Sequence, residues 1–175
     1  MCFPTCNSSF RKTISQPMQM HPNENLIHAF YQAFQRKDYE TMKKCYHEDA
    51  VFNDEAFRGL NACETGKMWE MLIKSGKDLE LEYSGVEADD KQGKAVWVAR
   101  YTFSKARRKV VNRIEAAFEF QDGKIVRHTD RFDFYRWARQ ALGLTGLLLG
   151  WAGFFRNKVR AGAKERLREY MKGKE

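Results

Sequence analysis

Apolar residues in the first part of the chain recur at helical spacing. From Asn25 onward they stand three or four positions apart, at Ile27, Phe30, Tyr31 and Phe34. A helix turns positions with this spacing to one side, where they can be buried together. The pattern therefore predicts a first helix that opens at Asn25 and buries this stripe.

Two further helices are indicated by residues that cap helix ends. Asp38 is placed to cap a short second helix, and Asn61 with Glu64 forms a capping-box pattern at the start of a third. Gly76 is a natural stop for that third helix. Between the second and third helices, residues 50–57 are expected to be extended.

After Gly76 the helical spacing gives way to alternation, which is typical of strands with one buried face. Four alternating segments follow, and Asp122-Gly123 has the residues of a tight hairpin turn before the last one. The inward positions of the last three segments are Ala95, Trp97, Ala99, Tyr101, Phe103, Val110, Asn112, Ile114, Ala116, Phe118, Phe120, Val126, His128, Asp130 and Phe132. The order of elements predicts an α+β fold, with three helices on one face of a curved antiparallel sheet.

The outward positions of these strands carry charges of both signs. They are Arg100, Arg113, Glu115, Glu119, Arg127 and Arg131. Opposite charges on neighbouring strands form cross-strand pairs. This face is expected to be either a solvated surface or an interface.

The chain has 175 residues, with 43% apolar and 31% charged residues, which suits one folded domain with extensions. The net charge is +8, and residues 134–175 alone hold ten Lys or Arg against three Glu. These basic residues alternate with Val159, Leu167 and Tyr170, as in an amphipathic helix, so no nucleic-acid binding is expected. No apolar run reaches the length of a membrane-spanning helix.

Residues 136–175 are expected to form an amphipathic helical extension. Within it Gly143, Gly146, Gly150 and Gly153 would form one stripe on a continuous helix. Such a stripe persists best where another backbone approaches closely. Docking on the protein itself is favoured over peripheral membrane contact through Arg156, Lys158, Arg160 and Lys164.

Residues 1–23 have no continuous apolar run and are expected to be a disordered leader. The alternatives are a true start at Met18 or Met20 and, less favoured, an organelle-targeting peptide. The four cysteines, Cys2, Cys6, Cys45 and Cys63, lack zinc-ligand spacing and are expected to be reduced thiols in the cytoplasm. The chain has no phosphate-binding glycine loop or dinucleotide motif, so no cofactor and no metal are predicted.

Four polar residues interrupt the apolar inward positions: Asp54, Asn112, His128 and Asp130. An apolar cavity with a few convergent polar groups is typical of a site for a small molecule. Asp54 follows Ala50 and Phe52 on one strand face, and burial would raise the pKa of its carboxyl and suit it to acid-base chemistry. The alternative role for Asp54 is structural: its carboxylate would accept hydrogen bonds from backbone amides in the following turn.

His128 and Asp130 lie two apart on one strand and so project to the same side. They are predicted to be an acid-base pair, with a structural network between strands as the alternative. Asn112 would either orient a ligand or bridge strands. Trp69, Trp97 and Tyr101 are expected to form the wall of the pocket.

The sequence resembles the nuclear transport factor 2-like superfamily, which includes SnoaL-like cyclases, ketosteroid isomerases and limonene epoxide hydrolases. The resemblance spans residues 24–135 and rests on three segments, which are residues 46–54, the hairpin at residues 122–125 and the strand at residues 128–133. It implies one domain over residues 24–135, with a cone-shaped fold and an internal pocket. It also implies a homodimer formed through the charged sheet face.

The resemblance to ketosteroid isomerases places Asp54 at the position of their proton-shuttling carboxylate. Their oxyanion-binding tyrosine and protonated aspartic acid fall on Phe30 and near Ala116, neither of which can donate a hydrogen bond through its side chain. Steroid isomerisation is therefore disfavoured, although Tyr31, beside Phe30, would supply one hydroxyl to a ligand.

Two functions follow from these expectations. The first is a cofactor-independent isomerase, cyclase, dehydratase or epoxide hydrolase acting on an apolar small molecule through Asp54, His128 and Asp130. The second is a non-catalytic protein that binds a hydrophobic ligand in the pocket, or another protein through the pocket or the tail.

Overall fold

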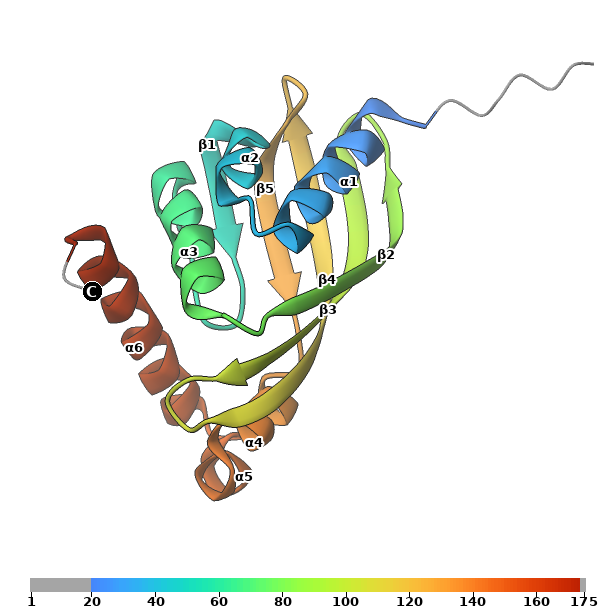
Figure 1. The fold of residues 1–175 in the computed structure, drawn as a ribbon. Coiled ribbons are helices and arrows are strands. Elements are labelled where there is room, and N and C mark those ends of the chain that lie inside the picture. Colours follow the sequence, from blue (N-terminus) through green and yellow to red (C-terminus); the bar gives the residue numbers. More distant parts are fainter. Residues whose placement is uncertain (1–19, 174–175) are drawn as a thin grey trace, which may run out of the picture.

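The computed structural model describes residues 20–173, which fold into a curved sheet with helices against its concave side (Figure 1). The strands are β1 (Tyr46–Asn53), β2 (Glu80–Ala88), β3 (Gln92–Phe103), β4 (Arg108–Gln121) and β5 (Lys124–Arg131). The helices against them are α1 (Pro22–Gln35), α2 (Tyr39–Lys44) and α3 (Ala62–Ser75). The predicted α+β architecture is confirmed.

The sheet has the order β1-β5-β4-β3-β2, and every pair is antiparallel except β1 with β5. The meander from β2 to β5 brings the last strand beside the first, running in the same direction. In this parallel pair Phe52 stands opposite His128 and Asn53 opposite Thr129. Asp54 and Asp130, the next residue on each side, therefore lie beside each other at the same end of the two strands.

The helix ends follow the predicted caps, with one earlier start. Asp38 accepts from the Thr41 amide at 3.0 Å, and Asn61 and Glu64 make the capping box of α3. However, α1 begins at Pro22 and not at Asn25, because His21 caps it and Glu24 accepts from the His21 amide at 3.2 Å. The predicted leader thus ends in the first turn of α1, and its residues 1–19 lie outside the described part of the chain.

The predicted alternation holds along β3 and β4, where Ala95, Trp97, Ile114 and Phe118 are buried in one continuous core. It fails at one position in β5. Val126 was expected to point inward, yet Ile125 is the fully buried residue. The reason is a bulge: Glu119 pairs with Arg127 and Phe120 pairs with Ile125, so Val126 is the extra residue and the alternation shifts.

The tail forms three helices, α4 (Phe134–Leu142), α5 (Leu144–Leu149) and α6 (Gly153–Met171). The expected glycine stripe on one continuous helix is therefore wrong. Gly143 has a φ of 61°, which ends α4 and redirects the chain. Only the close approach is confirmed, because a Cβ on Gly146 would lie 1.9 Å from the Ala138 carbonyl oxygen.

Helix α6 runs back along α3 and packs on the domain (Figure 1). Leu167 is buried in the main core, and the Tyr170 hydroxyl donates to Glu70 Oε1 at 3.1 Å. Arg160 donates to the Glu55 carbonyl at 2.9 Å and lies 3.1 Å from the Glu55 carboxylate. Between residues 20 and 173, no helix combines the length and the apolar character needed to cross a bilayer.

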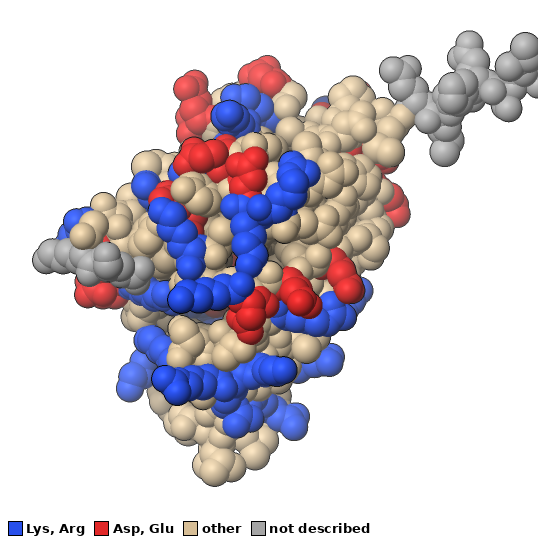
Figure 2. Space-filling model, in the orientation of Figure 1, with Lys and Arg blue, Asp and Glu red and all other residues tan. Residues whose placement is uncertain are grey.

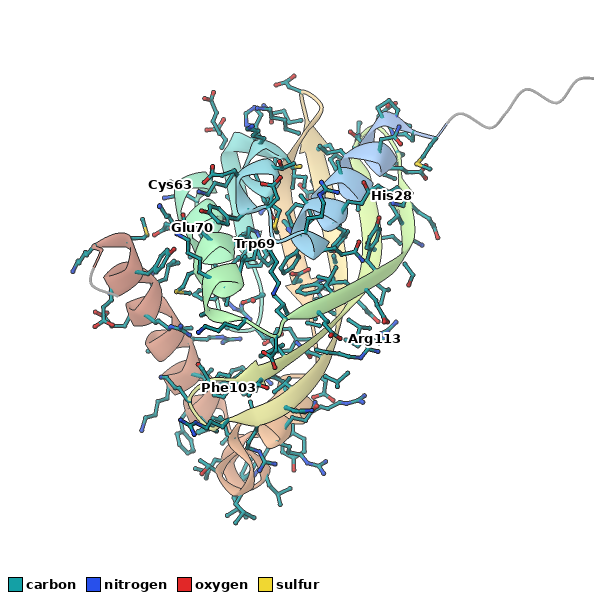
Figure 3. The ribbon with its side chains drawn as sticks, in the orientation of Figure 1. His28, Cys63, Trp69, Glu70, Phe103 and Arg113 are labelled. Atoms are coloured by element: carbon teal, nitrogen blue, oxygen red, sulfur yellow. The ribbon has the colours of Figure 1, made fainter. Side chains whose placement is uncertain are left out.

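The outer sheet face carries ion pairs, in line with the alternating charges of its strands. Arg127 pairs with Glu119 across strands at 3.2 Å, and Arg100 pairs with Glu82 at 3.1 Å. Arg113 pairs with Glu115 on its own strand at 2.6 Å. Figure 3 shows Arg113 on the side of the sheet that faces away from the helices.

Candidate active site

A cavity of about 610 Å³ lies between α3, the concave face of the sheet and the tail helices. Six of the eight predicted site residues line it: Asp54, Trp69, Trp97, Tyr101, Asn112 and Asp130. Trp69 extends from α3 toward the sheet, and Phe103, also in the wall, lies near α6 (Figure 3). The wall is mostly apolar, so its few polar groups stand out as the chemistry of the site.

The tail completes this wall, in line with the expected docking of the tail on the protein itself. Phe134 and Trp137 of α4 line the cavity together with Phe155, Val159 and Ala163 of α6. The domain expected at residues 24–135 therefore does not close the cavity by itself.

Asp54 stands at the end of β1 with its two carboxyl oxygens in different environments. Its Oδ1 accepts from the backbone amides of Ala56, at 2.7 Å, and Phe57. Its Oδ2 has no hydrogen-bond donor in the part of the chain that the structure describes. The turn-capping contact and the cavity position, which the sequence presented as alternatives, therefore occur together.

Burial raises the pKa of Asp54 from its ordinary value of 3.8 to about 7. That value includes a smaller upward contribution from the negative charge of Asp130 and the opposing effect of the Phe57 and Ala56 amides. A carboxyl with a pKa near 7 is present in both its protonated and its ionised forms at neutral pH. It can therefore give or take a proton there.

Asp130 lies at the end of a buried hydrogen-bonded chain. Its Oδ1 accepts from the Trp97 indole at 3.3 Å and lies 3.1 Å from His128 Nε2. His128 Nδ1 lies 2.7 Å from the Tyr46 hydroxyl, whose oxygen accepts from the Trp69 indole at 3.0 Å. Indole N–H groups only donate, so the consistent assignment has Tyr46 donating to Nδ1 and Nε2–H donating to Asp130.

His128 is the central member of this hydrogen-bonded chain and does not line the cavity. It is 1% exposed, and the Phe118 and Phe52 rings lie 4.4 and 5.1 Å from it between centroids. In this arrangement His128 orients Asp130 and does not face a ligand. Tyr46, which completes its contacts, was not singled out from the sequence, because only the pairing of β1 with β5 brings the two together.

Tyr31 is fully buried but does not line the cavity. Its ring stacks on Tyr83 of β2 with 4.9 Å between centroids, and burial raises the pKa of its hydroxyl well above 10. Among the described residues, no group hydrogen-bonds this hydroxyl. The predicted ligand contact of Tyr31 is therefore not seen in this arrangement.

Tyr101 and Asn112 supply two further polar groups of the wall. The Tyr101 oxygen accepts from the Trp137 indole at 2.9 Å, which leaves its own proton free to be donated. Burial raises the pKa of Tyr101, and the nearby charge of Asp54 raises it further. The Asn112 side chain has no hydrogen-bond partner within residues 20–173.

No group of three or more His, Cys, Asp or Glu side chains within residues 20–173 is arranged to hold a metal ion. The His47 ring lies 3.7 Å from the carboxylates of Asp49 and Asp122, both of which are exposed. Besides the two carboxyls, the phenol and the amide, the wall includes hydroxyl side chains and the cations Lys105, Lys158 and Arg166.

Comparison with solved structures shows a shared fold at low sequence identity. An LEH-like epoxide hydrolase of Mycobacterium tuberculosis matches with a TM-score of 0.56 and 20% identity, over 73% of this chain and 96% of that one. A nuclear transport factor 2-like protein of unknown function from Burkholderia pseudomallei matches with a TM-score of 0.61 and 16% identity, over 70% and 98%. TerC, co-crystallised with polyporic acid, matches with a TM-score of 0.58 and 17% identity, over 70% and 99%.

No curated protein sequence matches the chain. A family model does match, that of the SnoaL-like domain, over residues 27–128. This span exceeds half of the chain and runs from α1 to β5, so it covers the sheet and the three helices packed on it. The chain therefore belongs to the SnoaL-like domain family of the nuclear transport factor 2-like superfamily.

Proposed function

We propose that the protein binds an apolar small molecule in the cavity and transfers a proton to or from it without a cofactor. The observation that carries this proposal is Asp54, whose Oδ1 is held by two backbone amides and whose Oδ2 has no donor within residues 20–173. A carboxyl with a pKa of about 7 in an apolar wall is a cost to stability that proton transfer would explain.

Four polar residues of the wall have roles in this reaction. Ionised Asp54 accepts a proton from the ligand at Oδ2 and returns it to another position, or protonated Asp54 donates first. The Tyr101 hydroxyl donates a hydrogen bond to the oxygen on which negative charge develops. Asp130, oriented by His128 and Trp97, holds the second polar end of the ligand, and Asn112 fixes its orientation.

These roles fit isomerisation, cyclisation, dehydration or epoxide opening, all of which need an acid and a base but no redox group. The names of two neighbours support a small organic ligand, since one is an epoxide hydrolase and the other was co-crystallised with polyporic acid. Within the described residues Cys45 and Cys63 are unpaired, which supports the proposed cytoplasmic setting.

The second candidate is a non-catalytic carrier of the same apolar ligand. It is favoured by the two hydrogen bonds that Asp54 Oδ1 accepts from backbone amides, because holding the turn of residues 54–57 would by itself account for this aspartate. In that case the cavity binds the ligand and Asp54 changes no bond in it.

We also propose that the protein is a homodimer and that the charged sheet face is its interface. The ion pairs of Arg127 with Glu119 and of Arg113 with Glu115 are exposed in the single chain. A two-fold axis would let such pairs exchange partners between copies.

Ligand binding is tested by native mass spectrometry of the purified protein, with a substitution that fills the cavity. Ala99 lies in the cavity wall, so Ala99→Leu should displace a co-purifying apolar compound. Ala117, on the exposed face of β4, gives the matched control Ala117→Leu, which should retain the compound. If the compound is equally abundant in both variants, it does not occupy this cavity.

The same compound separates the enzyme from the carrier. After extraction it is incubated with wild-type protein or with Asp54→Asn, and its conversion is followed by chromatography coupled to mass spectrometry. The proposed enzyme converts the compound only with Asp54 present. Binding without conversion by either protein would favour the carrier.

A further inference from the structure

The corner formed by α5 and the start of α6 exposes an unusual number of large apolar side chains. We call this set the apolar tip: Leu144, Leu147, Leu148, Trp151 and Phe154. Leu144 and Trp151 are about three-quarters exposed, at 76% and 75%. Soluble proteins rarely leave a contiguous apolar patch of this kind uncovered, so the apolar tip has the character of a binding surface.

The opposite side of α5 already has its packing partner. Gly146 lies directly against the backbone of Ala138, and Gly150 lies close to Tyr135 and Ala138. The helix is thereby fixed on α4 with its leucines turned outward. In Figure 2 the lower end of the molecule, where Figure 1 places α5, is a tan projection. A convex apolar surface is suited to insertion into a lipid bilayer, whereas a peptide is usually bound in a groove.

Basic residues surround the apolar tip. Residues 134–164 contain no Asp or Glu, but they hold Arg136, Arg139, Arg156, Lys158, Arg160 and Lys164. The turn between β3 and β4 adds exposed Lys105 and Arg107, and the start of β4 adds exposed Arg108 and Lys109. Arg108 donates to the Gln140 carbonyl at 2.7 Å, which holds this turn beside α4. Figure 2 shows a band of Lys and Arg directly above the tan projection.

Charge and apolar surface meet in one open groove of about 820 Å³. Arg108, Arg136 and Arg139 line it together with Leu144 and Leu147 of the apolar tip. The carboxylate of Asp133, which also lines the groove, accepts from the Arg136 amide at 2.9 Å and caps α4. The groove thus places guanidinium groups, which bind phosphate well, next to leucines.

From these observations we infer that the apolar tip inserts into the surface of an anionic phospholipid bilayer, with lipid phosphates in the arginine groove. Apolar side chains enter the boundary of the acyl chains, while Lys and Arg at the same depth as the headgroups attract anionic lipid. A band of cations above an apolar projection matches this layering. This inference does not depend on the proposed reaction.

Membrane docking would also place the cavity beside the bilayer. Leu142 and Thr145, next to the apolar tip, line the cavity as well. An apolar ligand dissolved in the membrane would then have a short path to the site.

The inference is tested by flotation of the full chain with vesicles of phosphatidylcholine containing phosphatidylserine, and with vesicles of phosphatidylcholine alone. Wild-type protein should float with the anionic vesicles only. Two variants, Leu148→Glu with Trp151→Glu and Arg136→Gln with Arg139→Gln, should each reduce binding by about tenfold or more. The first variant changes the exposed apolar side chains of Leu148 and Trp151. The second removes the charges of Arg136 and Arg139, so the apolar and the charge contributions are tested separately.

Matched controls lie at the other end of the molecule. Met20→Glu changes another exposed apolar residue, and Lys91→Gln with Lys124→Gln removes two exposed positive charges. Both controls should float like the wild type. If they lose binding as strongly as the tip variants, total charge and not the apolar tip determines binding, and the inference is wrong.

Insertion of the apolar tip into the bilayer is measured by the fluorescence of Trp151. Lipids with brominated acyl chains should quench part of the tryptophan fluorescence of the wild type, and Trp151→Phe should abolish this quenching while flotation persists. Absence of flotation, or flotation without quenching, would overturn the inference. So would a wild-type oligomer that the Leu148→Glu with Trp151→Glu variant converts to a smaller species, because the apolar tip would then bind protein.

Discussion

The hydroxyl of Tyr46 lies 2.7 Å from Nδ1 of His128, and the two side chains are both almost fully buried. Because Tyr46 also accepts from the Trp69 indole, its only proton is directed to His128. This contact places the proton of a neutral His128 on Nε2, next to Asp130. A residue outside the cavity wall thereby sets the orientation of a carboxylate within it.

Tyr46→Phe should destabilise the fold by about 1 to 3 kcal/mol, because it leaves the Trp69 indole and His128 Nδ1 buried without their partner. The free energy of unfolding from urea titration measures this loss. Tyr39→Phe is the matched control, since no hydrogen bond of the Tyr39 hydroxyl is found within residues 20–173. A loss no larger than that of the control would mean that the chain of hydrogen bonds is not formed.

Asp54→Asn should raise stability at pH 8 and leave it unchanged near pH 3.5. Between pH 4 and 7 the folded protein keeps a proton on Asp54 that the unfolded chain releases, so the wild type loses stability as pH rises through this window. The rise of about three pKa units corresponds to at most about 4 kcal/mol, and less because the side chain is partly exposed. Asparagine has no charge to bury, and its side-chain oxygen can still accept the hydrogen bonds of the two backbone amides.

Melting temperatures across this pH range check the prediction, with Asp78→Asn as a control of opposite sign. Hydrogen bonds from Thr102 lower the pKa of Asp78, so its ionised form supports the fold above pH 4. Asp78→Asn should therefore lower stability at pH 8. If Asp54→Asn behaves in the same way, Asp54 is a structural residue.

Removal of residues 153–175 should leave a folded domain with an open cavity. Helix α6 contributes Phe155, Val159 and Ala163 to the wall, while the remaining helices and strands keep most of the core. The truncated protein should keep its far-ultraviolet circular dichroism per residue, apart from the lost helix, and bind more of a hydrophobic dye. Unchanged dye binding would contradict the packing of α6 over the cavity.

Arg113→Glu with Arg131→Glu should weaken the proposed dimer, because it places like charges beside Glu115, which pairs with Arg113 and stands opposite Arg131. Analytical ultracentrifugation of wild type and variant at micromolar concentration measures the change. The variant with Lys91→Gln and Lys124→Gln serves as a control for lost charge. A monomeric wild type, or a variant that dimerises as strongly, would exclude this interface.

Most of the fold could be predicted because its signals are local. The caps at Asp38 and Asn61 and the alternation along β3 and β4 each depend on neighbouring residues. The bulge at Val126 could not be predicted, since an extra residue in one strand becomes visible only from the register with its partner. The separate helices of the tail depend on the positive φ of Gly143, which apolar spacing does not reveal.

The candidate site was predictable where the alternation of a single strand decides it, as for Trp97, Asn112 and Asp130. Long-range packing determined the rest. Tyr31 belongs to the predicted buried stripe of α1, but the curved sheet brings Tyr83 of β2 against its ring, away from the cavity. His128 is withdrawn from the wall because the parallel pairing with β1 places Phe52 and Tyr46 around it.

The central claim is that Asp54 is a desolvated carboxyl ready for proton transfer at neutral pH. The most direct test is a nuclear magnetic resonance titration of the aspartate carboxyl carbons in ¹³C-labelled protein, with the Asp54 signal assigned by its absence in Asp54→Asn. The structure predicts a midpoint near pH 7 for this carbon. A midpoint near pH 4, the ordinary value for aspartate, would show that water reaches the carboxyl freely and would contradict the claim.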